Sequence, residues 1–334
     1  MRKLVIATIA AALVIGACGG DDPSVSPEDD PKASLTNAVE RLSEYEGVTM
    51  TFGLASTTDS LVAMSEGDLT PDNAQKILDS SFTITSKQGD NPEEAQAEVA
   101  ASIAGNDGAV ELKFLDDTLY MRADVAGIME SFGQDTSQLG QIKQQASAQP
   151  GFEFIGPALD GEWLALSGLE QALQQFGGST QAAEPSAAQQ QAIDSFAAAI
   201  GDSSEVTTGD AEGPGTHLIA TVPLRDAYGR FVELADEFGA GQAAQLPPAS
   251  KVPDEEVRLD AWVDGDELTQ FQLDFTQFAA FEDGEPLPEG VESFALQIGL
   301  EEFTDSVEAP SGATQVDINQ LLQGFIGVGG VPAS

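Results

Sequence analysis

Few side chains in this 334-residue sequence can carry covalent or metal chemistry. The chain has one cysteine, Cys18, and one histidine, His217. A lone thiol cannot form an intramolecular disulfide, and zinc sites need several histidine or cysteine ligands. The sequence also lacks Gly-x-Ser-x-Gly, Ser-x-x-Lys and any Gly-Lys pair of a P-loop. We therefore expect no catalytic residue, no metal site and no cofactor.

His217 stands in the apolar stretch Thr216-His217-Leu218-Ile219-Ala220. Two interpretations are open, a strand residue and a general base. The apolar alternation around the histidine favours the strand residue.

Cys18 has a specific context at the start of the chain. Arg2 and Lys3 precede an unbroken apolar run, Leu4–Ile15, which ends in Gly16-Ala17-Cys18. A basic start, a short apolar core and small residues at the end are typical of a secretory signal. The ending resembles a bacterial lipobox, in which the cysteine receives the lipid. The alternative is an ordinary secretory signal followed by a chance cysteine. We predict lipidation at Cys18, with palmitate-type acyl chains.

The charge of the chain is strongly one-sided. Thirteen Lys and Arg face 56 Asp and Glu, a formal net charge of −43. Nucleic-acid binding is excluded, because it needs basic surface to replace the counterions of phosphate. An anionic membrane also repels such a body, so attachment must come from acyl chains on Cys18. We interpret the acidity as a solubility or salt adaptation rather than as the mark of a cationic partner.

The sequence divides into four parts. We predict a lipoprotein signal peptide at residues 1–17, and a lipidated cysteine with a disordered acidic tether at 18–33. An α+β domain follows at 34–307, and a C-terminal tail with a possible short helix at 308–334. The expected location is outside the cell, on the outer face of the cytoplasmic membrane.

Hydrophobic periodicity predicts the elements of the domain. Helical spacing begins after Ser34, which suits an N-cap, and Thr70-Pro71 suits the start of a second helix. Alternation of apolar and polar residues is typical of half-buried antiparallel strands. The predicted strands are 48–54, 81–87, 95–103, 109–115, 118–123, 257–263, 271–275 and 294–300. Three further helices, 124–132, 167–176 and 224–238, each end in Phe-Gly.

Two segments rich in Gln, Ala and Ser, 134–150 and 178–191, are interpreted as flexible insertions or frayed helix. Residues 239–253 contain three prolines and form a connector. Neither half of the chain has enough strands for a sheet of its own. We therefore predict one domain.

Three places resemble envelope lipoproteins of the LppX/LprG type, which share the fold of LolA-like lipoprotein carriers. They are the helix running into a strand at Leu35–Leu54, the hairpin Val257–Phe275 and the strand exit Phe303–Pro310. The chain is longer and more acidic than that pattern, and its Gln/Ala-rich insertions are extra. The resemblance implies a single curved antiparallel sheet, a half-barrel, with helices packed on its concave face around an apolar cavity.

The resemblance also implies a lipid or glycolipid ligand. Candidate lining residues of the cavity are apolar side chains of the predicted strands; the alternative is that they fill a dry core. They are Phe52, Leu112, Phe114, Phe271, Leu273, Phe275 and Phe294. Three functions stay open: a carrier of lipid or acylated envelope components, a non-enzymatic scaffold or interaction lipoprotein without a ligand, and an enzyme using paired carboxylates.

Overall fold

The computed structural model describes residues 26–42, 44–87, 89, 94–116, 118–147, 151–167, 204–237, 248–280 and 286–318. The predicted signal peptide, Cys18, most of the tether and residues 178–191 lie outside these residues. The predicted helix 167–176 does too, except for Ser167, which ends a strand rather than starting a helix. Among the described residues, no helix is long and apolar enough to cross a bilayer.

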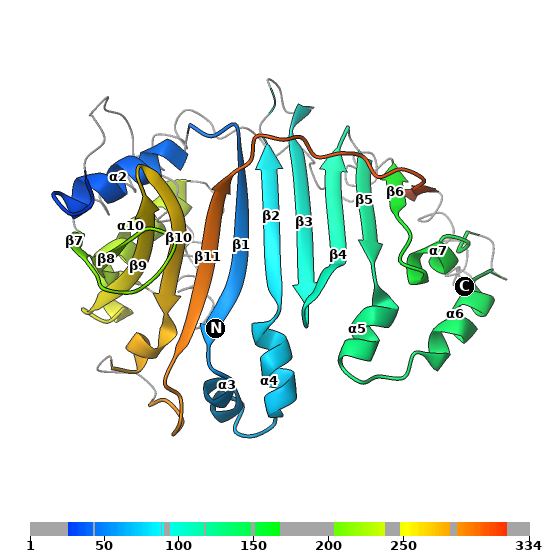
Figure 1. The fold of residues 1–334 in the computed structure, drawn as a ribbon, viewed down its shortest axis with the longest axis horizontal. Coiled ribbons are helices and arrows are strands. Elements are labelled where there is room, and N and C mark those ends of the chain that lie inside the picture. The colour runs from blue at the N-terminus through cyan, green and yellow to red at the C-terminus, as the bar shows by residue number, and fades with distance from the viewer. Residues whose placement is uncertain are drawn as a thin grey trace, which may run out of the picture. The chain divides into compact units, whose positions relative to one another are not determined.

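The fold is α+β and is built on one large sheet that is not closed. Its twelve strands follow the order β12-β6-β5-β4-β3-β2-β1-β11-β10-β9-β8-β7, as the reader can follow in Figure 1. Among the strand pairs whose register the described residues define, all are antiparallel except β12 with β6, which is parallel. The predicted class, an α+β protein with a single, mainly antiparallel sheet, is confirmed.

Two compact units make up the chain, and each is assembled from separate segments. Unit 1 comprises residues 1–45, 54–69 and 183–302, and unit 2 comprises 46–53, 70–182 and 303–334. Both units are therefore formed from both halves of the sequence. The single-domain boundary 34–307 stays a prediction.

Unit 2 is a run of neighbouring hairpins. Its strands are β1 (Gly47–Ser56, whose first seven residues belong here), β2 (Ser81–Lys87), β3 (Gln96–Ile103), β4 (Asn106–Leu115), β5 (Thr118–Ala123), β6 (Leu164–Ser167) and β12 (Thr314–Asp317). Its helices are α4 (Pro71–Leu78), α5 (Val125–Ser131), α6 (Ser137–Ser147) and α7 (Ile155–Leu159). Side-chain caps start two of them: Thr70 accepts from the amide of Asn73 at 3.3 Å, and Asp124 accepts from that of Gly127 at 2.8 Å.

Unit 1 holds a packed core. Its strands are the end of β1 with β7 (Glu205–Thr208), β8 (Thr216–Pro223), β9 (Glu256–Asp264), β10 (Glu267–Asp274) and β11 (Phe294–Glu302). Its helices are α2 (Pro31–Leu42), α3 (Thr58–Met64) and α10 (Leu224–Glu237), with short 3-10 turns η3 (Ala249–Lys251) and η4 (Phe275–Ala280). Buried residues of α10, including Ala227 and Tyr228, pack on residues of β8, β9 and β10, and Leu35 of α2 packs against the same cluster.

Several predicted boundaries were wrong. The first helix begins at Pro31, so Pro31–Ala33 are helical rather than tether, and Ser34 is not its cap. Proline fits the first turn because it has no amide hydrogen to leave unpaired, and Asp30 accepts from the amide of Ala33 at 3.1 Å.

Two other segments also differ from the expectation. Residues 137–147 form the helix α6 where an insertion or frayed helix was expected. The tail contributes the strand β12. The short helix that we expected in the tail falls mainly on residues outside the described ones.

The predicted turn Asp264-Gly265 is displaced by one residue. Asp264 pairs with Glu267, so Gly265 and Asp266 form the loop. Gly265 has φ +65°, a conformation that suits glycine. Gly133, after the Phe-Gly helix α5, likewise has φ +68° as predicted.

Candidate functional site

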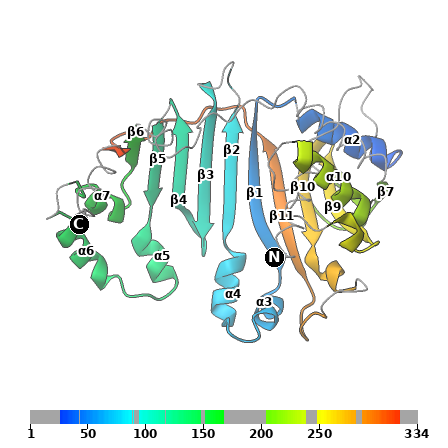
Figure 2. The same cartoon turned by 180° about the vertical axis from the view of Figure 1, so that it is seen from behind.

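Strand register sorts the side chains of unit 2 onto two chemically different faces. Residues directly opposite each other in antiparallel strands point to the same face, and neighbours along a strand point to opposite faces. Met50 is opposite Ile84, and the row continues through Val99, Leu112 and Met121 to Leu164. Figure 2 shows the strands β1 to β6 that carry this row side by side, seen from behind.

Two parallel rows extend the same face. One contains Phe52, Phe82, Ala101, Val110 and Ala123, and the other contains Val48, Ser86, Ala97, Phe114, Leu119, Leu166 and Val316. We call these three rows the apolar face. Ser86 is its one polar member, and none of its side chains is charged.

The opposite face of the same strands carries polar side chains, which form hydrogen bonds and ion pairs with one another. Thr49 and Thr85 share a hydrogen bond of 3.0 Å between their hydroxyls, next to a Lys113–Glu98 ion pair at 3.3 Å. Arg122 pairs with Glu111, and its guanidinium lies 5.0 Å from the ring centre of Trp163. These cross-strand pairs satisfy the polar groups of this face, including the buried Thr85.

The apolar face is incompletely covered. Phe82 is 41% exposed and Phe114 is 37% exposed, while most other side chains of the face are half-buried. The two rings come from β2 and β4. Exposed aromatic rings on a charge-free face form a surface that water solvates poorly.

The corresponding core of unit 1 is different. Phe271 is 9% exposed and Leu273 only 4%. Phe275 packs against the core cluster and lies 5.6 Å from Phe294, measured between ring centres. The same kind of alternation therefore produces a filled core in unit 1 and a partly open face in unit 2.

The predicted lining residues thus fall into two groups. Phe52, Leu112 and Phe114 lie on the apolar face of unit 2, whereas Phe271, Leu273, Phe275 and Phe294 belong to unit 1. Whether any of them contacts a ligand stays a prediction.

Sequence reasoning missed Met50, Phe82, Ile84, Val99 and Met121 as members of the face. The signal was present, because Phe82-Thr83-Ile84-Thr85 alternates like the other strands.

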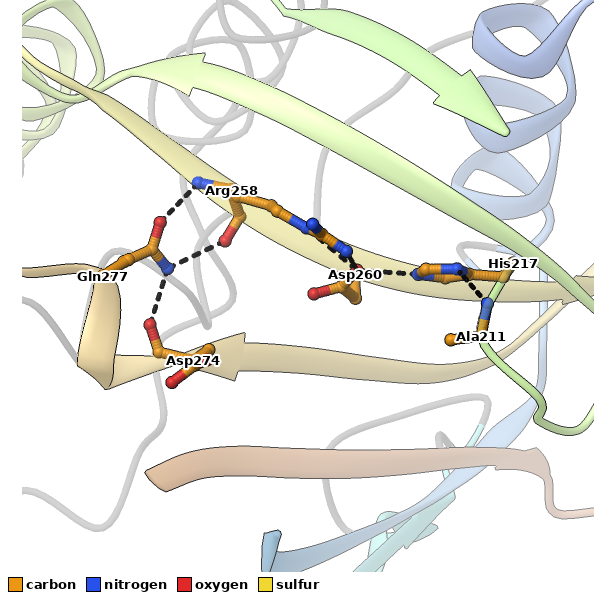
Figure 3. A network of polar contacts seen from close by, with 6 residues as sticks. All are labelled: Ala211, His217, Arg258, Asp260, Asp274 and Gln277. Carbon is orange, nitrogen blue, oxygen red and sulfur yellow. Dashed lines mark hydrogen bonds and ion pairs between the residues drawn. The ribbon is translucent and has the colours of Figure 1, made fainter. Parts of the chain in front are cut away.

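His217 lies in β8, and the prediction that it is a strand residue is confirmed. Its Nε2 lies 2.7 Å from Oδ1 of Asp260, and its Nδ1 accepts from the amide of Ala211 at 3.0 Å (Figure 3). Both ring nitrogens are thus occupied, and the side chain is 3% exposed. This geometry leaves no nitrogen free to take a proton from a substrate. Among the described residues, no group of three or more His, Cys, Asp or Glu could hold a metal.

Fold and site together describe an α+β protein with a large open sheet and one partly uncovered apolar face. Among solved structures, the chain is similar to the lipoprotein LppX of Mycobacterium tuberculosis. The two share 11% sequence identity, the alignment covers 84% of this chain and 100% of that chain, and the TM-score is 0.32. No family model and no curated protein matches the sequence.

Proposed function

We propose that this chain is an exported, lipid-anchored protein that shelters acyl chains on the apolar face of unit 2. The observation that carries the proposal is the incomplete burial of this face, with Phe82 and Phe114 as its most exposed rings. A ligand that covers these rings removes apolar surface from water at about 25 cal/mol per Å².

The dimensions of the face suit such a ligand. Six strands spaced about 4.8 Å apart span roughly 24 Å, and the three rows of side chains on β1 to β5 span roughly 13 Å along the strands. One leaflet of a bilayer core is about 15 Å thick, which sets the scale of an acyl chain. Several chains can therefore lie side by side across the strands.

The predicted lipidation of Cys18 supports the same function. Acyl chains on Cys18 hold the protein at a membrane, where lipids are the most abundant apolar molecules. The net charge of −43 keeps the folded body away from an anionic surface. The protein therefore takes up lipid that leaves the membrane and does not insert into the membrane itself. The role is binding and transfer, without a catalytic step.

The test is the content of organic extracts of the purified protein. The mature chain with Cys18→Ser, produced in its native type of host, is extracted and analysed by mass spectrometry. A defined lipid at near-stoichiometric amount supports the proposal. If the extract contains no lipid although the protein is folded, the protein is a scaffold without a ligand.

A further inference from the structure

A loop in unit 1 lies directly on a pair of stacked rings. His217 and Trp262 stack with ring centres 4.8 Å apart, and residues 209–215, which join β7 to β8, run over them. The amide of Gly209 donates to the carbonyl of His217 at 2.8 Å, and Thr269 donates its hydroxyl to the carbonyl of Pro214 at 2.8 Å. We call this segment the 209–215 loop.

The glycines of the loop explain how close it comes. A Cβ placed on Gly209 would lie 2.0 Å from Nδ1 of His217, and one placed on Gly213 would lie 2.0 Å from Nε1 of Trp262. Backbone without side chains therefore covers both rings. Trp262 is only 3% exposed, and its indole nitrogen is buried without a hydrogen-bond partner among the described residues.

One contact of the loop depends on the protonation state of His217. Nδ1 accepts the amide hydrogen of Ala211, so this nitrogen carries no hydrogen. The ring hydrogen is then on Nε2, which donates to Asp260. The structure thus requires a neutral imidazole, because an imidazolium is a donor at both nitrogens.

The charged surroundings of His217 are few. Asp260 and Arg258 come from the neighbouring strand β9, and Nη2 of Arg258 donates to the same Asp260 oxygen at 2.6 Å. Asp210 and Glu212 flank Ala211 in the loop, and β10 contributes the uncharged Gln270 and Gln272 opposite β9. Helices α2 and α10 pack on the other face, with the core cluster that contains Ala220. Oδ1 of Asp260 is therefore shared between His217 and Arg258.

We propose that His217 is a proton-operated latch for the 209–215 loop. Protonation of Nδ1 sets two N–H donors against each other, so the bond from Ala211 is lost. The amide of Ala211 then loses its acceptor on the ring, and the loop detaches and uncovers Trp262. The latch lies in unit 1 and does not rest on the acyl-binding function.

The direct test is hydrogen exchange of the Ala211 amide in the full mature chain. The protection factor, corrected for the intrinsic pH dependence of exchange, is measured at pH 7.5 and at pH 5. Loss of one hydrogen bond changes the population of the open loop by about fivefold, so we expect an about fivefold fall in protection in acid. The amide of Leu224, which donates to Glu255 at 2.9 Å elsewhere in unit 1, serves as the unchanged control. Equal protection of Ala211 at both pH values overturns the latch.

A variant separates the ring from general acid effects. In His217→Asn, the amide oxygen can take the place of Nδ1 as acceptor, but it does not titrate in this range. We expect the protection of Ala211 in this variant to be independent of pH. The same acid-induced loss in the variant contradicts the proposal.

Tryptophan fluorescence gives a second readout with the histidine left intact. The chain has two tryptophans, so Trp163→Phe leaves Trp262 as the only emitter. Acrylamide quenching of this variant should rise on acidification. Quenching that stays constant while Ala211 remains protected refutes the latch without any change to His217.

Discussion

Removal of one exposed ring from the apolar face should weaken acyl binding much more than it weakens the fold. Phe114 is 37% exposed. An aromatic side chain has about 200 Å² to bury, so roughly 75 Å² remains for a ligand to cover. At about 25 cal/mol per Å², that area is worth about 1.9 kcal/mol, or an about 20-fold change in affinity. Phe82, at 41% exposed, gives an about 30-fold change by the same reasoning.

These factors are reached when the ligand covers each ring completely. The assay is the displacement of a fluorescent long-chain fatty acid from delipidated mature protein with Cys18→Ser. Phe114→Ala and Phe82→Ala should raise the Kd of the fatty acid by up to these factors.

Tyr120→Ala is the matched control. Tyr120 lies on β5 opposite Lys113, so its ring belongs to the polar face of the same sheet. We expect its removal to leave the Kd unchanged. Equal loss of affinity in all three variants would mean that the fold is disturbed generally. Unchanged affinity in Phe82→Ala and Phe114→Ala would refute the assignment of the face.

Three further outcomes are expected. Cys18→Ala should yield a soluble protein or an unprocessed precursor in cell fractionation, and membrane association at the normal mature size would contradict the lipobox. Leu273→Ala, in the core of unit 1, should lower the free energy of unfolding in urea by about 2–5 kcal/mol without changing the Kd for the fatty acid, and a weaker affinity would place the site in unit 1 instead. Burial raises the pKa of Tyr228, and burial with the nearby Glu267 raises the pKa of Tyr45, both from a usual value of 10.0. Neutral phenols therefore stabilise the fold below about pH 10, and this stabilisation is lost above it. As the pH rises above about 10, the urea midpoint should fall less steeply in the double variant Tyr45→Phe, Tyr228→Phe than in the unchanged protein.

Most of the strands could be predicted from the sequence, but the elements that pack against each strand could not. Alternation at Phe52, Leu112 and Phe114 and at Phe271 and Leu273 has the same period, so it predicts a half-covered strand in each case. Which strands receive helices depends on long-range packing, and this decided that Leu273 is buried while Phe114 is not. Single-strand periodicity carries no information on that choice.

The prediction missed strand β12 and helix α6 for a different reason. The four-residue β12 has no period long enough to recognise, and its parallel partner β6 lies far back in the sequence. Helix α6 was hidden by its Gln-rich composition, although Leu139, Ile142 and Ala146 recur at helical spacing.

The contact between Ala211 and His217 could not be predicted either. It depends on how the 209–215 loop folds back onto β8, which glycine content alone does not determine.

The most direct test of the proposed acyl-binding face is to map where a bound fatty acid touches the chain. A fatty acid with a photoreactive group at its end is bound to the mature protein, irradiated, and located by peptide mass spectrometry. The proposal predicts labels in β2, β3 and β4, between residues 81 and 115, and their displacement by excess unlabelled fatty acid. Displaceable labels confined to peptides of unit 1, or no displaceable label at all, would contradict it.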